Sequence, residues 1–180
     1  MLDHPGRRVK MGPMPPVLVH VSGRHARQLR SFVAEEPPPW PSLPVLAGRD
    51  PVLGFLERAQ RLRAHGRQET FAVCEDDRLI GLGVLARDDR VPDRAELGYW
   101  VAAPYRGRGH GTAAARGLLA HGFERMRLTL AFARAASGNH ASLRVLDKIG
   151  LRFVGIEPAG EGNEPFRRYE LGREDWLSVR

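Results

Sequence analysis

The sequence predicts an α+β fold, a single domain in which a mixed, mostly antiparallel sheet of six to seven strands is flanked by about four helices. Three observations lead to this fold class. The chain has 180 residues, a length that suits one domain with its own core. Three strand-like runs follow one another between residues 71 and 101, separated by polar turns. Beyond a glycine-rich loop, helical and strand patterns then alternate.

The N-terminal part of this fold begins after a tail. Residues 1–16 are basic and rich in proline without an apolar period, so we expect a flexible tail followed by a domain over 17–180. Within the domain, 17–21 reads as a strand, and Ser22 can cap a helix over 23–36 that the prolines at 37–39 end. The proline-rich segment 40–50 has no period. Asp50 followed by Pro51 then predicts the start of a second helix that runs to Gly66.

The remaining elements follow from short apolar runs and helical spacing. Residues 71–74 and 79–86 flank the polar connection 75–78 and predict a β-hairpin. A third strand over 94–101 extends it into an antiparallel meander. The expected C-terminal elements are a helix over 109–126, a strand over 128–133, a helix over 139–149, and strands over 151–156 and 166–171.

The composition limits the function classes. Apolar residues make up 42% and charged residues 27%, as in ordinary soluble proteins. The net charge of +7 comes almost entirely from arginine, since Lys10 and Lys148 are the only lysines. These arginines are scattered and form no basic run, which argues against nucleic-acid binding as the main function and leaves an anionic cofactor as one explanation.

The single cysteine and the absence of long apolar runs define the expected environment. Cys74 cannot form an intramolecular disulfide or a Cys-rich zinc site, and no metal is expected. Its apolar neighbours favour a buried structural thiol over a nucleophile. We find no signal-like segment and no apolar run of membrane-spanning length, so the sequence predicts a cytoplasmic protein without membrane association.

The loop Arg106-Gly107-Arg108-Gly109-His110-Gly111 precedes a helical pattern. Backbone N–H groups at a helix N-terminus attract anions, and the glycines let several of them converge while the arginines add charge. A pyrophosphate cradle is therefore predicted, although a simple helix-starting turn is an alternative. The loop lacks the lysine of a Walker motif, and Thr112 stands where a dinucleotide-binding loop has its third glycine.

Together with its flanking motifs, this loop resembles that of the GNAT N-acetyltransferases, and in particular the subgroup that acetylates the N-termini of ribosomal proteins. The resemblance rests on Tyr-Arg-Gly-Arg-Gly-His-Gly-Thr at 105–112, Glu-Leu-Gly-Tyr-Trp-Val at 96–101 and the segment from Asn139 to Leu151. The family's loop pattern, Arg/Gln-x-x-Gly-x-Gly/Ala, is met by Arg106, Gly109 and Gly111. The resemblance is co-linear from Val17 to Trp176 and weakest between Pro37 and Asp50.

The resemblance implies direct transfer of an acetyl group from acetyl-CoA to an amine, without a metal, and assigns Glu96 as the general base. Strand alternation places Glu96, Gly98 and Trp100 on one face and Leu97, Tyr99 and Val101 on the other. A solvated strand-edge carboxylate is the alternative interpretation of Glu96.

The resemblance also implies the cofactor contacts. Backbone groups near Trp100 and Val101 would bind the pantetheine arm like an added strand. Asn139 would contact the cofactor, or simply cap its helix, and Ser142 would lie near the sulfur as a candidate proton donor. Tyr105 and His110 could touch the cofactor, with a surface position favoured for His110. The predicted cofactor-binding set is Trp100, Val101, Arg106, Gly107, Arg108, Gly109, His110, Gly111, Thr112, Asn139 and Ser142.

The acceptor amine is less well defined. An α-amine with a pKa near ~8 is easier to deprotonate than lysine near ~10.4, which favours a peptide N-terminus or a small-molecule amine. The acidic segment 157–164 suggests a cationic acceptor. A drug or aminoglycoside acetyltransferase and a non-catalytic CoA-binding or RNA-associated module are the alternatives. Similar proteins often form homodimers, which suggests the same here by analogy.

Overall fold

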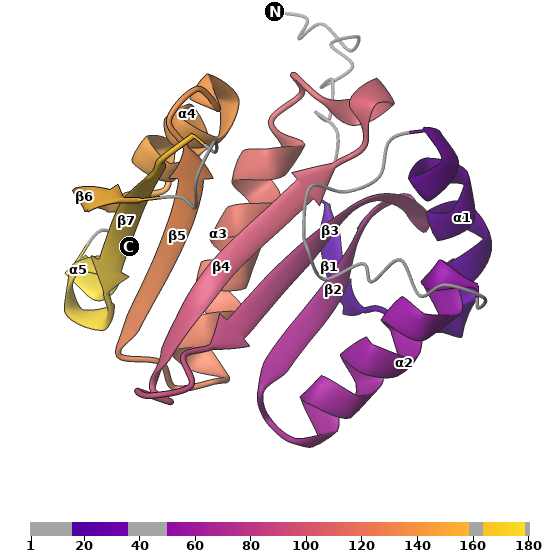
Figure 1. The fold of residues 1–180 in the computed structure, drawn as a ribbon, viewed down its shortest axis with the longest axis horizontal. Helices are drawn as coiled ribbons and strands as arrows, with labels where there is room; N and C mark the ends of the chain where they lie inside the picture. The colour runs from indigo at the N-terminus through magenta and orange to yellow at the C-terminus, as the bar shows by residue number, and fades with distance from the viewer. Residues whose placement is uncertain (1–15, 36–49, 159–163, 179–180) are drawn as a thin grey trace, which may run out of the picture.

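The computed structural model describes residues 16–35, 50–158 and 164–178. One seven-stranded sheet has the order β1-β2-β3-β4-β5-β7-β6 (Figure 1). Its strands are β1 (Val17–His20), β2 (Gln68–Glu75), β3 (Arg78–Arg87), β4 (Arg94–Val101), β5 (Leu130–Ala136), β6 (Arg152–Glu157) and β7 (Phe166–Gly172). The helices are α1 (Ala26–Glu35), α2 (Pro51–Ala64), α3 (His110–Glu124), α4 (His140–Lys148) and α5 (Arg173–Ser178), with 3-10 turns η1 (Gly23–His25) and η2 (Ala103–Tyr105).

The predicted fold class is confirmed, and most differences concern element ends. The hairpin strands β2 and β3 are longer than expected. At the turn each gains one residue, because Asp76 and Asp77 both adopt positive φ and form a tight two-residue turn, and β2 also begins three residues earlier, at Gln68. The strand expected over 128–133 begins two residues later, since Arg127 has a φ of 58° and the N–H of Leu128 bonds to the carbonyl of Gly122. The first helix starts with the 3-10 turn η1.

Two expectations lie wholly or largely outside the described residues, and one helix was missed. The predicted tail over 1–16 is described only at Pro16, the proline-rich segment 40–50 is described only at Asp50, and the prolines at 37–39 lie outside the described residues. The sequence analysis did not predict α5, which packs Trp176 against Phe123 of α3 with ring centroids 5.2 Å apart. Within the described ranges, no helix has the length and hydropathy needed to span a bilayer.

The first strands of the sheet are covered on both faces. On one face α1 and α2 pack Leu29, Phe55 and their neighbours against Leu82 and Trp100. On the other face α3 packs Leu118 and Phe123 against Leu85 and neighbouring side chains. The thiol of Cys74 is buried in the first of these clusters, and this burial raises its pKa, as expected for a structural cysteine.

The strands β4 and β5 separate along their length. They run parallel, and their register joins Arg94 with Leu130 and ends at Glu96 opposite Phe132. Beyond this pair β4 continues to Val101 and β5 to Ala136, without further pairing between the described residues of the two strands. The backbone edge of β4 that faces β5 is therefore open next to the glycine loop.

Candidate active site

The glycine loop forms a left-handed turn ahead of α3. Gly107 and Gly109 have φ values of 75° and 85°, a region that strongly favours glycine. Gly109 is the N-cap residue, and its carbonyl accepts the N–H of Ala113. The N–H groups of the first three helical residues, His110, Gly111 and Thr112, therefore have no partner within the helix. This arrangement has the geometry of an anion cradle.

Arginine side chains fix and charge this cradle. The Nε of Arg106 donates to the carbonyl oxygen of Val101 at 2.8 Å, which ties the loop to the end of β4. Arg106 and Arg108 are both exposed. A diphosphate at the helix end would meet converging N–H groups and two guanidinium groups, so the residues present fit the cofactor that the sequence predicts.

Gly111 leaves room for an aromatic ring. A Cβ atom at this position would lie 3.3 Å from Cε2 of Tyr99, tighter than most contacts of this kind. The glycine therefore allows the first turn of α3 to approach β4 closely. Tyr99 faces α3, in agreement with the alternation predicted from the sequence.

Tyr99 is a candidate functional residue that the sequence analysis did not single out. Its hydroxyl is buried and has no hydrogen-bond partner of standard geometry in the described part of the chain. Burial raises the pKa of the phenol above its usual value, and the nearby Ser142 side chain offsets part of this rise. An unpartnered buried hydroxyl is uncommon and suggests that a ligand satisfies it. Its strand face and its spacing from Glu96 were the available signals.

Asn139 and Ser142 lie at the start of α4, as predicted. The Oδ1 of Asn139 accepts the N–H of Ser142 at 3.1 Å, so Asn139 caps the helix. The amide nitrogen of Asn139 can still serve a ligand. Leu143, Leu146 and Ile149 on the same helix belong to the core.

The surface position favoured for His110 was wrong. Its side chain is only 4% exposed and is directed toward β2, where its Nε2 lies 3.6 Å from Oε1 of Glu75. The reason is that the first turn of α3 docks on the sheet, so a side chain at its first position meets the strands. The buried imidazole of His110 is directed away from the loop, so only its backbone N–H remains suited to the predicted pyrophosphate cradle.

The side chain of Trp100 points away from the loop. It is buried on the α1 and α2 face, where its ring packs edge-on against Phe32 with centroids 5.7 Å apart. The predicted contacts at Trp100 and Val101 involve backbone groups, and these lie on the stretch of β4 that is not paired with β5.

Glu96 forms a two-pronged ion pair with Arg134 of β5. The Nε and Nη2 of Arg134 donate to the two carboxylate oxygens of Glu96 at 2.9 and 2.7 Å. The hydrogen bond with Glu96 raises the pKa of Arg134 above its ordinary value. Glu96 is partly exposed and lies at the last residue pair before β4 and β5 separate. Its carboxylate is held in one orientation by Arg134 and is therefore not freely solvated.

This pair belongs to a charged network across β5, β6 and β7. Arg168 bonds to Glu157 at 2.9 Å and to Glu170 at 2.7 Å, and Glu157 lies 3.7 Å from Arg134. The guanidinium of Arg168 also stacks over the Phe132 ring at 4.1 Å. Three carboxylates thus meet two guanidinium groups beside the point where β4 and β5 part.

The structure thus places the predicted site residues in two groups around the separated strands. The loop, Tyr99 and Ser142 lie on the α3 side, whereas Glu96 lies on the opposite face with Arg134. Two surface hollows of about 400 and 480 Å³ lie elsewhere, near β1, and contain none of these residues. A linear molecule passing between the strands would reach both groups.

Comparison with known proteins identifies the fold family. The acetyltransferase (GNAT) domain model matches residues 23–152, well over half of the chain. The chain belongs to the GNAT acetyltransferase family. This agrees with the sequence prediction of an acyltransferase.

Individual relatives support the family and differ in the acceptors they name. The chain is 40% identical over 75 residues to "Putative ribosomal N-acetyltransferase YdaF" of Bacillus subtilis (strain 168), a segment that spans 42% of this chain and 41% of that protein. The CoA complex of RimL, a ribosomal L7/L12 α-N-protein acetyltransferase, has a TM-score of 0.76 at 14% identity, covering 90% of this chain and 96% of its own. A chimera of the spermidine N-acetyltransferase SpeG of Vibrio cholerae and hSSAT has a TM-score of 0.72 at 16% identity, covering 91% and 98%. These structural likenesses establish the fold.

Proposed function

We propose that the chain transfers an acetyl group from acetyl-CoA to a primary amine, at a protein or peptide N-terminus or on a small molecule. The observation that carries the proposal is the glycine loop, whose converging N–H groups stand at the open end between β4 and β5. GNAT family membership and the CoA bound to the RimL fold support acetyl-CoA as the donor. Acetyl-CoA would supply an acyl group already activated as a thioester.

The chain would hold this donor through backbone and side-chain groups. The N–H groups of residues 107–112 bind the pyrophosphate, with charge from Arg106 and Arg108. The open edge of β4 at Trp100 and Val101 pairs with the pantetheine amides in the manner of an added strand. Asn139 offers its free amide hydrogens at the start of α4. Together these contacts orient the thioester in the gap between the strands.

Glu96 would act as the general base. Attack requires a neutral amine, and Glu96 accepts the amine proton directly or through one water. Arg134 orients the carboxylate, and each carboxylate oxygen retains a lone pair for a further hydrogen bond. The amine would arrive from the face that carries Glu96, opposite the loop.

Tyr99 and Ser142 would supply the proton to the leaving thiolate. Within the described residues the buried Tyr99 hydroxyl makes no hydrogen bond of standard geometry, and burial raises its pKa, so it is protonated at neutral pH. As the C–S bond breaks, a hydroxyl on this side donates to the sulfur while Glu96 holds the amine proton on the other. The two proton transfers thus occur on opposite sides of the sheet, which agrees with the separation of the two residue groups.

The charged network supports a cationic acceptor. Glu96, Glu157 and Glu170 bring three carboxylates to the acceptor face, where they contact Arg134 and Arg168. Glu164 also belongs to the acidic segment 157–164. Its carboxylate lies beside Gly138, immediately before the α4 cap. Carboxylates on both sides of the gap favour a positively charged acceptor such as a basic peptide N-terminus or a polyamine.

The proposal is tested in two steps on the full chain. Acetyl-CoA should raise the Tm, and a thiol-release assay should then detect turnover with a panel of ribosomal-protein N-terminal peptides, polyamines, aminoglycosides and neutral amines. Glu96→Gln should lower kcat by about 10²–10⁴-fold without weakening acetyl-CoA binding. Glu57→Gln, on the exposed side of α2 and away from the proposed site, is the control and should change kcat by less than about threefold.

Each step can fail separately. The absence of any stabilisation by acetyl-CoA would refute the donor assignment. Stabilisation without thiol release from any amine would indicate a non-catalytic CoA-binding module. Equal turnover of neutral and cationic acceptors would contradict the acidic acceptor face.

A further inference from the structure

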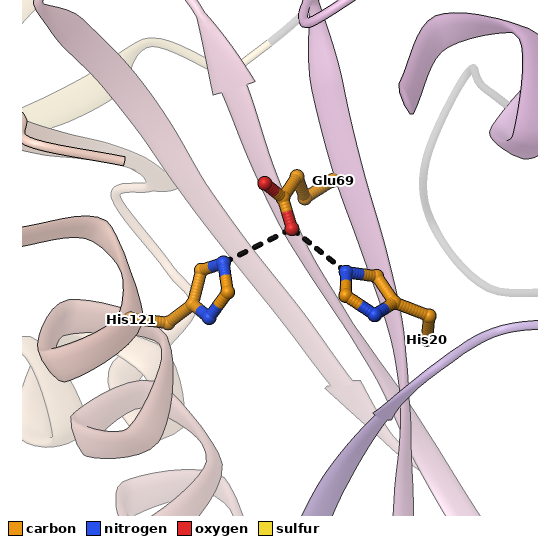
Figure 2. Close-up of side chains that lie close together, drawn as sticks. All are labelled: His20, Glu69 and His121. Carbon is orange, nitrogen blue, oxygen red and sulfur yellow. Dashed lines mark hydrogen bonds and ion pairs between the residues drawn. The ribbon is translucent and has the colours of Figure 1, made fainter. Parts of the chain in front are cut away.

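Two histidines and a glutamate meet at the end of the sheet remote from the glycine loop. His20 comes from β1, Glu69 from β2 and His121 from the last turn of α3 (Figure 2). Both imidazoles direct Nε2 at the same carboxylate oxygen, Oε2 of Glu69, at 2.7 and 3.0 Å. His121 lies eleven residues beyond His110 on α3, or roughly 16 Å along the helix from the loop.

The three donor atoms have the spacing of a metal site. They all lie within 4.8 Å of one another. Ligand atoms at 2.0–2.2 Å from a tetrahedral zinc ion are roughly 3.4 Å apart. Small side-chain shifts would therefore let an ion take the place of the protons that now lie between the imidazoles and the carboxylate. Two imidazoles and one carboxylate form a donor set typical of zinc sites with three protein ligands and an open fourth position.

The surrounding residues hold the rings in place. Phe71 is buried between the two histidines, and its ring centroid lies 4.7 Å from that of His20 and 4.9 Å from that of His121. Gly117, one turn before His121, brings α3 so close to β1 that an added Cβ would lie 2.9 Å from a methyl carbon of Leu18. The donors are therefore mounted on rigid, closely packed elements.

The electrostatics and access also suit a cation. The Glu69 carboxylate faces both imidazoles directly, so an ion bound there would be held by one anionic and two neutral donors. The side chains of the three residues are 23–31% exposed, which leaves a path for an ion and for a water ligand.

We propose that His20, Glu69 and His121 bind one divalent transition-metal ion of the Zn²⁺ type, completed by water. The ion would join the edge strand β1 to the end of α3. Because the three ligands are separated by about fifty residues along the chain, such a link would stabilise the folded state over the unfolded chain. The site is distinct from the proposed acetyl-transfer site and does not depend on it.

The test uses metal-free full-length protein and Zn²⁺ in competition with a chromophoric chelator. Wild-type protein should bind one Zn²⁺ tightly, and His20→Ala, His121→Ala and Glu69→Gln should each weaken binding by about 10–100-fold or more. The exposed His65 at the end of α2 provides the control, since His65→Ala should bind as the wild type does. Co²⁺ should give the intense visible bands of a tetrahedral complex in wild type and not in the variants.

Thermal unfolding provides a second measurement. Zn²⁺ at about 100-fold above its Kd should raise the wild-type Tm by about 5–10 °C and leave the His20→Ala/His121→Ala double variant unchanged. Metal-free Tm values of the variants show whether they fold. Binding that is equal in wild type and a folded double variant would overturn the proposal, because the ion would then be held by other histidines.

Discussion

The two ends of the sheet are built differently, although both belong to one continuous sheet (Figure 1). The strands β1 to β3 lie between α1 and α2 on one face and α3 on the other, and side chains such as Leu82 and Leu85 are fully buried. On β5, β7 and β6, the corresponding face carries Arg134, Arg168 and their glutamate partners. At the first end, both faces of the sheet are covered by apolar side chains, whereas at the second end one face carries charged side chains.

This difference explains where a reactive site can form. The strands β1 to β3 have no open face for a substrate, and β4 is the last strand that both helical layers reach. From Glu96 onward β4 loses its partner β5, so the covered and the charged ends meet at this gap. The scaffold supplies rigidity to the loop and Tyr99, and the charged end supplies Glu96 and its oriented partner.

The largest expected effect would come from opening a cavity in the covered end. Leu82→Ala removes a fully buried side chain of β3 that packs against α1 and α2. The substitution should reduce the free energy of unfolding by about 2–5 kcal/mol. At the other end, Ile156→Ala on the exposed strand β6 should cost less than about 0.5 kcal/mol. Chemical denaturation of both variants measures the contrast, which similar losses would abolish.

The next effect separates activity from stability at the boundary. Tyr99→Phe removes the buried hydroxyl and should lower kcat by about 10–100-fold. Because the hydroxyl makes no hydrogen bond of standard geometry within the described residues, the free energy of unfolding should stay the same or rise slightly. Steady-state kinetics and denaturation test both parts, with Tyr169→Phe on β7 as the matched control. If kcat is unchanged, Tyr99 is a packing residue.

A smaller effect is expected in the charged network. Arg168→Met breaks its ion pairs with Glu157 and Glu170 but keeps an apolar chain over Phe132. Because these groups remain partly solvated, the loss of stability should be about 1 kcal/mol or less. If denaturant titrations show that the free energy of unfolding falls by several kcal/mol, the charged end contributes as much to stability as the covered end.

The smallest effect concerns acid pH at the covered end. The lowered pKa of Glu69 means that its carboxylate contributes stability above the ordinary glutamate pKa, and this contribution disappears as pH falls through the folded-state pKa. Metal-free Glu69→Gln should therefore lose less stability between pH 6 and pH 3 than wild type, with a difference in Tm of roughly 1–2 °C. Parallel Tm–pH curves would contradict this.

Particular residues show how far the sequence predicts this molecule. Some residues act through local backbone geometry, namely Pro51, Asp76, Asp77, the loop glycines and Asn139. The helices and strands that these residues delimit were predicted to within a few residues. The position of His110 was wrong because its environment depends on how α3 docks on the sheet. The helix α5 was missed because its six residues are stabilised by Trp176 packing on Phe123.

The sequence by itself determined the strand and helix pattern, the glycine loop and, through the co-linear motifs, the GNAT family. These depend on local backbone preferences and on the order of residues along the chain. The tertiary structure decided that Arg134 orients Glu96, that Tyr99 lies beside Ser142, and that His20, Glu69 and His121 converge. Such contacts join residues that are tens of positions apart, and only the packing of α3 and the strand order β4-β5-β7-β6 brings them together.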